Sequence, residues 1–100
     1  MTEAAPSQEG RPLFPLGETV ATPSALAALD IAGVTPETLL ACHERGDWGD
    51  LSDHDRQMND RALPSGGRLL SAYRLPDGTR VWIVTEADRS ATTLLLPDDY

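Results

Sequence analysis

The stretch RLLSAYRLPDGTRVWIVTEADRSATTLLLPDDY, residues 68–100, decides the fold that the sequence predicts, because it holds most of the strong β-forming residues. Two apolar-rich runs, 69–75 and 81–85, flank the turn sequence PDG at 76–78, and a third run, 92–96, follows a short charged loop. Proline suits the second position of a type I turn, and glycine suits the left-handed position that follows it. The stretch therefore predicts a three-stranded antiparallel β-meander.

The turn also sets which residues of the hairpin share a face of the sheet. If Leu75 and Thr79 flank the turn, one face carries Leu69, Ser71, Tyr73, Val81, Ile83 and Thr85. The other face carries Leu70, Ala72, Arg74, Arg80, Trp82, Val84 and Glu86. We expect the helices to cover one of these faces and the other to be half exposed or covered by the N-terminal segment.

Short helices are predicted ahead of the meander. A Thr-Pro pair occurs at 22–23 and again at 35–36, where threonine accepts a hydrogen bond from an unpaired amide and proline takes the first helical position. Ser52 begins a capping box and a third, polar helix to about Leu63. Residues 17–21 are compatible with a short edge strand, but so short a run does not settle it. The predicted fold class is α+β, with about three short N-terminal helices packed on a C-terminal three-stranded antiparallel β-meander.

The chain is long enough for one compact domain. Its 100 residues are 40% hydrophobic, which suffices for a single core. Residues 1–16 are polar and small with three prolines, so we expect a flexible N-terminal arm, followed by a single α+β domain over residues 17–100. Leu13, Phe14 and Leu16 are expected to anchor the end of that arm to the domain.

Charge narrows the classes of partner. Sixteen acidic residues stand against eight basic ones, all arginine, which gives a net charge of −8. Direct binding to a nucleic-acid backbone is not expected, because such binding depends on clustered cations that displace counterions. The balance fits either an acidic domain with no further role for its charge or an acidic surface that engages a basic protein in place of nucleic acid.

Composition also predicts the compartment. The chain has no window of about 18 apolar residues and no basic and apolar leader, so neither a membrane span nor a secretory signal is expected. A single cysteine, Cys42, forms no internal disulfide and fits a reducing environment. We therefore expect a cytoplasmic protein.

A cluster of possible metal ligands lies between residues 42 and 55. It contains Cys42, His43, His54 and four aspartates, but it lacks the CxxC, HExxH and EF-hand spacings, so no metal is expected. Helix capping and solvation explain the aspartates more simply. Cys42 and His43 are sequence neighbours that diverge on a helix, which favours a buried thiol over a nucleophile. No glycine-rich phosphate loop is present, and no cofactor is expected.

The most suggestive polar cluster lies where two predicted strands end, a place where rigid scaffolds present functional groups. Asp88 and Ser90 are also ordinary turn residues, and Arg89 is expected to pair with Glu86. Elsewhere Trp48 is expected to clamp a turn, and Asp55 and Asn59 lie one helical turn apart. The candidate binding residues are therefore Trp48, Asp55, Asn59, Glu86, Asp88, Arg89 and Ser90.

Four stretches carry a resemblance to a known family: GDWGDL at 46–51, the Asp55 and Asn59 pair, RLLSAY at 68–73, and WIVTEADRSATTLLLPDDY at 82–100. Together they resemble small bacterial proteins of about this length that occur on plasmids and related elements. Members are labelled plasmid-related protein or type I restriction endonuclease subunit M. The chain lacks the glycine-rich cofactor loop and the Asp/Asn-Pro-Pro-aromatic motif of a DNA methyltransferase. The resemblance therefore implies a protein of a mobile genetic element.

Two functions remain open on the sequence. The favoured one is a small acidic, non-enzymatic interaction or regulatory protein of a mobile element, which antagonises a host defence system by binding an unidentified protein partner; a homodimer through an exposed strand edge is compatible with it. The alternative is a small ribonuclease of the barnase or RelE type, suggested by helices that precede a small antiparallel sheet. In that case His43 and Glu86 would be the acid–base residues and Arg89 the phosphate anchor.

Overall fold

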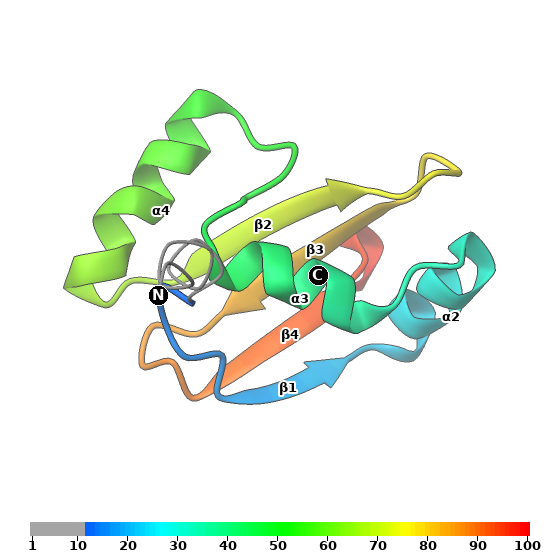
Figure 1. Cartoon of the computed structure of the whole chain (residues 1–100), viewed down its shortest axis with the longest axis horizontal. Coiled ribbons are helices and arrows are strands. Elements are labelled where there is room, and N and C mark those ends of the chain that lie inside the picture. The colour runs from blue at the N-terminus through cyan, green and yellow to red at the C-terminus, as the bar shows by residue number, and fades with distance from the viewer. Residues whose placement is uncertain (1–11) are drawn as a thin grey trace, which may run out of the picture.

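The computed structural model describes residues 12–100, which form a single sheet with helices over one face. Figure 1 shows α3 lying across the sheet, α2 near one end of the strands and α4 beside β2. The elements in chain order are β1 (Glu18–Ala21), α2 (Pro23–Ala32), α3 (Pro36–Glu44), α4 (Asp53–Ser65), β2 (Leu69–Arg74), β3 (Arg80–Thr85), β4 (Ala91–Leu95) and the 3-10 helix η1 (Pro97–Asp99).

The sheet has four strands in the order β1-β4-β3-β2, and β1 runs parallel to β4. The predicted three-stranded antiparallel meander behind N-terminal helices is therefore wrong: a fourth strand precedes the helices, which lie in the middle of the chain. Strands β2, β3 and β4 do pair antiparallel. The fold class was missed because a four-residue strand is too short for a clear alternation, and its partner is distant in sequence: Glu18 pairs with Ala91.

A glycine positions the start of β1. Gly17 has a φ of +67°, and a Cβ atom built on it would lie 2.4 Å from the carbonyl oxygen of Ser90. No other residue fits so close to that backbone in a left-handed conformation. The next amide, that of Glu18, donates to the same Ser90 oxygen at 3.0 Å. Gly17 thus lets β1 pack against the loop between β3 and β4, residues 86–90, which we call the joint between these strands.

The three predicted helix starts are confirmed. The side-chain oxygens of Thr22, Thr35 and Ser52 each accept a hydrogen bond from the amide three residues later, at 3.1, 3.4 and 3.2 Å. Each cap satisfies an amide that has no partner within its helix. These short-range bonds fix where α2, α3 and α4 begin.

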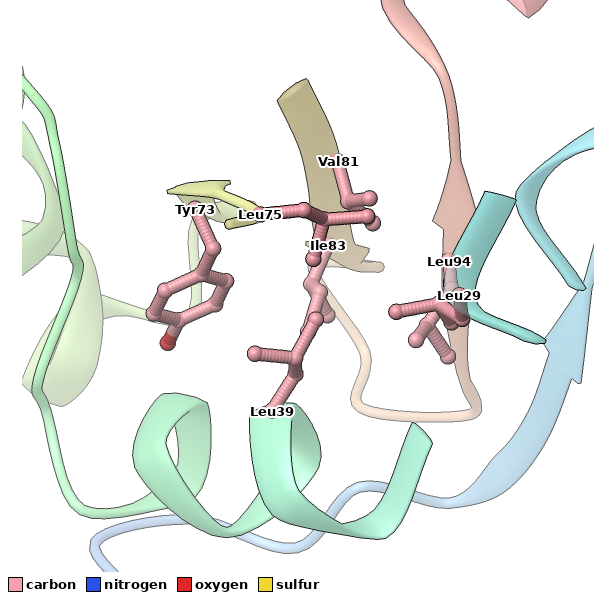
Figure 2. Close-up of a cluster of buried hydrophobic side chains, with 7 residues drawn as sticks. All are labelled: Leu29, Leu39, Tyr73, Leu75, Val81, Ile83 and Leu94. Carbon is pink, nitrogen blue, oxygen red and sulfur yellow. The ribbon is translucent and has the colours of Figure 1, made fainter. Parts of the chain in front are cut away.

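The predicted faces of the hairpin are also confirmed, since Arg74 pairs with Arg80 across the turn. The helix-covered face is buried and forms the larger core cluster. Figure 2 shows Leu39 extending from α3 toward Ile83 and Val81, with Leu29 and Leu94 on the other side of the cluster. The full set is Leu29, Leu39, Tyr73, Leu75, Val81, Ile83 and Leu94.

A second core cluster joins the N-terminal segment to α4 and β2. It contains Phe14, Trp48, Ala62 and Leu69. Residues 1–11 of the predicted flexible arm lie outside the described residues. Of the three residues expected to anchor the arm, Phe14 is 6% exposed, Leu16 packs against the cluster and Leu13 is 56% exposed. Phe14 is therefore part of the core.

Candidate functional site

His43, the candidate acid–base residue, lies on α3 with a side chain that is fully buried. Its Nδ1 is 2.5 Å from the hydroxyl of Ser71, and its Nε2 is 2.9 Å from the hydroxyl of Thr85. The Thr85 oxygen lies 2.8 Å from that of Thr92, whose hydroxyl donates to the Leu16 carbonyl at 2.7 Å. A continuous buried chain of hydrogen bonds thus crosses the sheet from α3 to the segment before β1.

The end of this chain fixes the proton positions. Thr92 uses its only proton on the Leu16 carbonyl, so its oxygen accepts from Thr85. The Thr85 oxygen then accepts from His43 Nε2, and Nδ1 is left to accept from Ser71. Burial lowers the pKa of His43 to about 4, so at pH 7 the imidazole is neutral, with its proton on Nε2 and Nδ1 accepting from Ser71. Both ring nitrogens are occupied within the core.

Phe14 brings three of the residues singled out in the sequence to one place. The ring of His43 meets it edge-on with centroids 5.2 Å apart, and Trp48 stacks on it at 6.2 Å. The guanidinium carbon of Arg89 lies 5.7 Å from the centre of the same ring. Trp48 is itself 4% exposed, so this candidate binding residue packs in the core. Beyond the expected anchoring of Phe14, no sequence pattern indicated this central position.

Arg89 fastens three pieces of backbone together. Its Nη1 donates to the carbonyl oxygens of Gly67, Glu86 and Ala87 at 2.6, 3.2 and 3.2 Å. Its Nη2 donates to the carbonyl of Ala62 at 3.0 Å, near the end of α4, where a cation is favoured. The expected pairing of the Arg89 and Glu86 side chains is not found, because Arg89 bonds only the backbone oxygen of Glu86. Arg89 therefore ties α4 to the joint between β3 and β4.

The other residues of that joint have separate environments. The Glu86 carboxylate lies 3.6 Å from Nε of Arg68, and both side chains are about half exposed. Asp88 accepts from the Ser90 amide at 3.0 Å, which is a local turn bond. The structure therefore does not gather His43, Glu86 and Arg89 around one accessible cleft.

Asn59 and Asp55, which both lie on α4, also have different environments. Asn59 is 3% exposed, and its amide bonds both backbone groups of Leu70, with Nδ2 donating at 2.6 Å and Oδ1 accepting at 3.1 Å. Asp55 is exposed in the first turn of α4. Asn59 thus covers part of the outer edge of β2, a role that only its proximity to Leu70 reveals.

A further part of that edge, at Ala72, is covered by the turn around Trp48. The Ala72 amide donates to the Trp48 carbonyl at 3.1 Å, and the Asp50 amide donates to the Ala72 carbonyl at 2.6 Å. Arg56 holds the turn in place by donating to the Gly49 carbonyl at 2.6 Å. The outer edge of β2 is therefore paired within the chain at Leu70 and Ala72.

Among the described residues, most carboxylates at the surface form no salt bridge. Between described residues, salt bridges use only two carboxylates: Asp50 binds Arg74 and Arg80 at 3.5 and 2.8 Å, and Glu86 binds Arg68. Arg56 and Arg89 bond backbone carbonyls instead. The exposed carboxylates outside these pairs include Glu18, Asp30, Glu37, Asp47, Asp53, Asp55 and Asp60.

Among the hollows on the surface of residues 12–100 are two that were not anticipated from the sequence. One of about 190 Å³ lies on the sheet face opposite the helices, between Trp82, Arg68 and Tyr100. The other, of about 250 Å³, lies between β1 and the helices α2 and α3. Over residues 12–100, no group of three His, Cys, Asp or Glu side chains is placed to hold a metal ion. In the same range no single helix is long and apolar enough to cross a membrane, and only α2 with α3, bent by 104°, pass that test together.

Comparison with protein-family models, with curated proteins and with solved structures gave no match.

Proposed function

We propose that this protein is a small acidic interaction or regulatory protein that acts by binding another protein and has no catalytic activity of its own. One observation carries the proposal: the guanidinium of Arg89, which a phosphate-cleaving centre would need at its surface, bonds four backbone carbonyls. The imidazole of His43 is likewise enclosed in the core. The two side chains best suited to catalysis, those of Arg89 and His43, are thus engaged in holding the fold together.

The surface charge supports a basic partner. Most carboxylates have no cation beside them within the described residues, while Arg56 and Arg89 are bonded to backbone oxygens. An excess of one sign steers a partner of the opposite sign and suppresses wrong partners. The partner we propose is therefore a protein with a basic surface, such as one that ordinarily binds nucleic acid.

The biological setting follows from the family resemblance. A plasmid-borne acidic protein of this kind would antagonise a host defence protein by placing carboxylates on the surface where that protein normally binds the phosphates of nucleic acid. The net charge of −8 supports this setting. Its single cysteine supports action in the reducing cytoplasm. The ribonuclease alternative has no specific geometric support, because His43 is enclosed in the core, Arg89 bonds backbone carbonyls and the Glu86 carboxylate pairs with Arg68 at the surface.

A capture experiment with an enzymatic control tests the proposal. The purified protein is immobilised, a partner is captured from the native host, and its affinity is measured by calorimetry at 50 and 200 mM salt. We expect a defined complex that weakens as salt rises, since screening shortens the range of electrostatic attraction. A fluorescent RNA incubated with the same preparation should stay intact. RNA cleavage that follows the protein through purification and is lost in a folded His43→Gln variant would overturn the proposal.

A further inference from the structure

The outer edge of β1 presents backbone groups without partners among the described residues. The amides of Glu18 and Thr22 point into the sheet, donating at 3.0 Å to Ser90 and Leu94. Because directions alternate along a strand, the amide and carbonyl groups of Thr19 and Ala21 point away from β4. Figure 1 shows β1 at the rim of the sheet, with β4 on one side only. Within residues 12–100 this edge is open, whereas the edge at β2 is covered at Leu70 and Ala72.

The larger surface hollow lies directly beside this open edge. Ala21 and Leu94 contribute to it from the sheet, Leu26 from α2 and Leu40 from α3, around a volume of about 250 Å³. Leu26 is 47% exposed, so the hollow reaches the surface. Residues opposite each other on adjacent strands share a face. A strand added to β1 would therefore place one side chain into this hollow.

We infer that β1 binds an extended segment of the partner protein by strand addition, with one bulky apolar side chain in the hollow and basic residues on either side of it. This inference rests on the proposed function and adds the surface and the chemistry of the partner. The open amides and carbonyls of Thr19 and Ala21 supply the backbone bonds. The hollow supplies the preference for a leucine-sized or aromatic side chain.

Charge and size favour a foreign segment over a second copy of this chain. Glu18 and Glu37 are both exposed beside the site, and Glu37 lines the hollow. A second copy would bring its own Glu18 and a further net charge of −8 to the same edge. Its β1 would offer only threonine and alanine to a hollow of about 250 Å³. A segment with an aromatic residue between arginines fits both features.

A synthetic peptide tests the inference directly. The probe is TRVFVRT, acetylated and amidated at its ends, in which phenylalanine and both arginines face one side and both valines the other. In an NMR titration of the full chain we expect shifts at Thr19, Val20 and Leu40 and slower exchange of the Thr19 and Ala21 amides. Peptides with glutamate for arginine, or alanine for phenylalanine, should bind at least about tenfold more weakly. Shifts confined to another surface would overturn the inference.

Variants of the protein separate strand addition from general charge attraction. Thr19→Pro removes an outward amide and no inward one, so the sheet should persist and the probe should bind about tenfold more weakly. Glu37→Arg should weaken the probe about threefold to tenfold. Asp60→Arg changes the net charge equally on α4, away from β1, and should leave binding within about twofold. Equal losses in the Glu37 and Asp60 variants would contradict a site at β1.

The outcomes also distinguish this inference from the proposed function. A captured partner that binds Thr19→Pro as tightly as wild type would overturn strand addition while protein binding stands. If no partner is captured, the proposed function fails. The peptide titration then shows on its own whether the outer edge of β1 binds an extended basic segment. A concentration-dependent dimer in sedimentation that Thr19→Pro abolishes would make a second copy the occupant and overturn the inference.

Discussion

Asn59 pairs with Leu70 as a neighbouring strand would, donating to its carbonyl at 2.6 Å and accepting from its amide at 3.1 Å. Asn59→Leu keeps a similar size but leaves both backbone groups of Leu70 without these partners. We expect a loss of about 2–3 kcal/mol in the free energy of unfolding, measured in urea. Gln57→Leu makes the same kind of change at an exposed position of α4 and should stay within about 0.5 kcal/mol of wild type. Equal stabilities would contradict the role given to Asn59.

Arg89 is predicted to affect the free energy of unfolding in two separate ways. Its guanidinium stabilises the fold, whereas its left-handed backbone conformation destabilises it. Arg89→Ala removes four carbonyl contacts and the contact with Phe14, and should cost about 2–4 kcal/mol. Arg89→Gly loses the same side chain but relieves a φ of +63°, so it should be about 1 kcal/mol more stable than the alanine variant. Chemical denaturation of both variants measures the difference. An alanine variant as stable as the glycine variant would argue against backbone strain at Arg89.

Two glycines with similar φ angles provide a matched pair. Gly33 has a φ of +72° with open space where an added methyl group would lie, so Gly33→Ala should cost only about 1–2 kcal/mol of conformational strain. Gly17 has a φ of +67° and would bring the methyl group within 2.5 Å of the Arg89 and Ser90 oxygens. Gly17→Ala should therefore cost clearly more and release β1 from β4. Thermal unfolding and exchange of the Glu18 amide report the two effects, and equal losses would contradict the close docking of Gly17.

His43 should make the fold sensitive to acid. Its pKa is lowered by burial to about 4, against an ordinary value near 6.5, so the unfolded chain binds the proton first as pH falls. The contribution is present above pH 6.5 and is lost as pH falls toward about 4, with a total of about 3 kcal/mol. Unfolding in urea between pH 7 and 4 measures this slope. His43→Gln should flatten it, whereas the exposed His54→Gln should not; a slope unchanged by His43→Gln would contradict the assignment.

The sequence predicts the parts of this fold that depend on nearby residues. Helix starts at Thr22, Thr35 and Ser52 could be predicted because each cap bonds an amide three residues away. The hairpin could be predicted because its register follows from the turn. The strand β1 was only a possibility from residues 17–21, because its pairing depends on Gly17 approaching Ser90, far along the chain.

The residues of the candidate site differ in the same way, since a sequence pattern could indicate some of their roles and not others. Ser71 and Thr85 fall on the face of the hairpin that the helices cover, so two hydroxyls among apolar side chains could have indicated that a polar partner was needed. His43, on an apolar flank of its helix, was available as that partner. The role of Arg89 had no comparable signal, since it depends on how closely Ala62 and Gly67 approach the joint.

The parallel pairing of β1 with β4 has a consequence for the order of events on the ribosome. Thr92 bonds a carbonyl at Leu16, 76 residues earlier in the chain. At about 5–20 residues per second, β1 is synthesised roughly 4–15 s before its partner exists. Strands β2, β3 and β4 are close in sequence and can pair as soon as they emerge, because short loops close at little entropic cost. The first strand to be made is therefore the last to be placed.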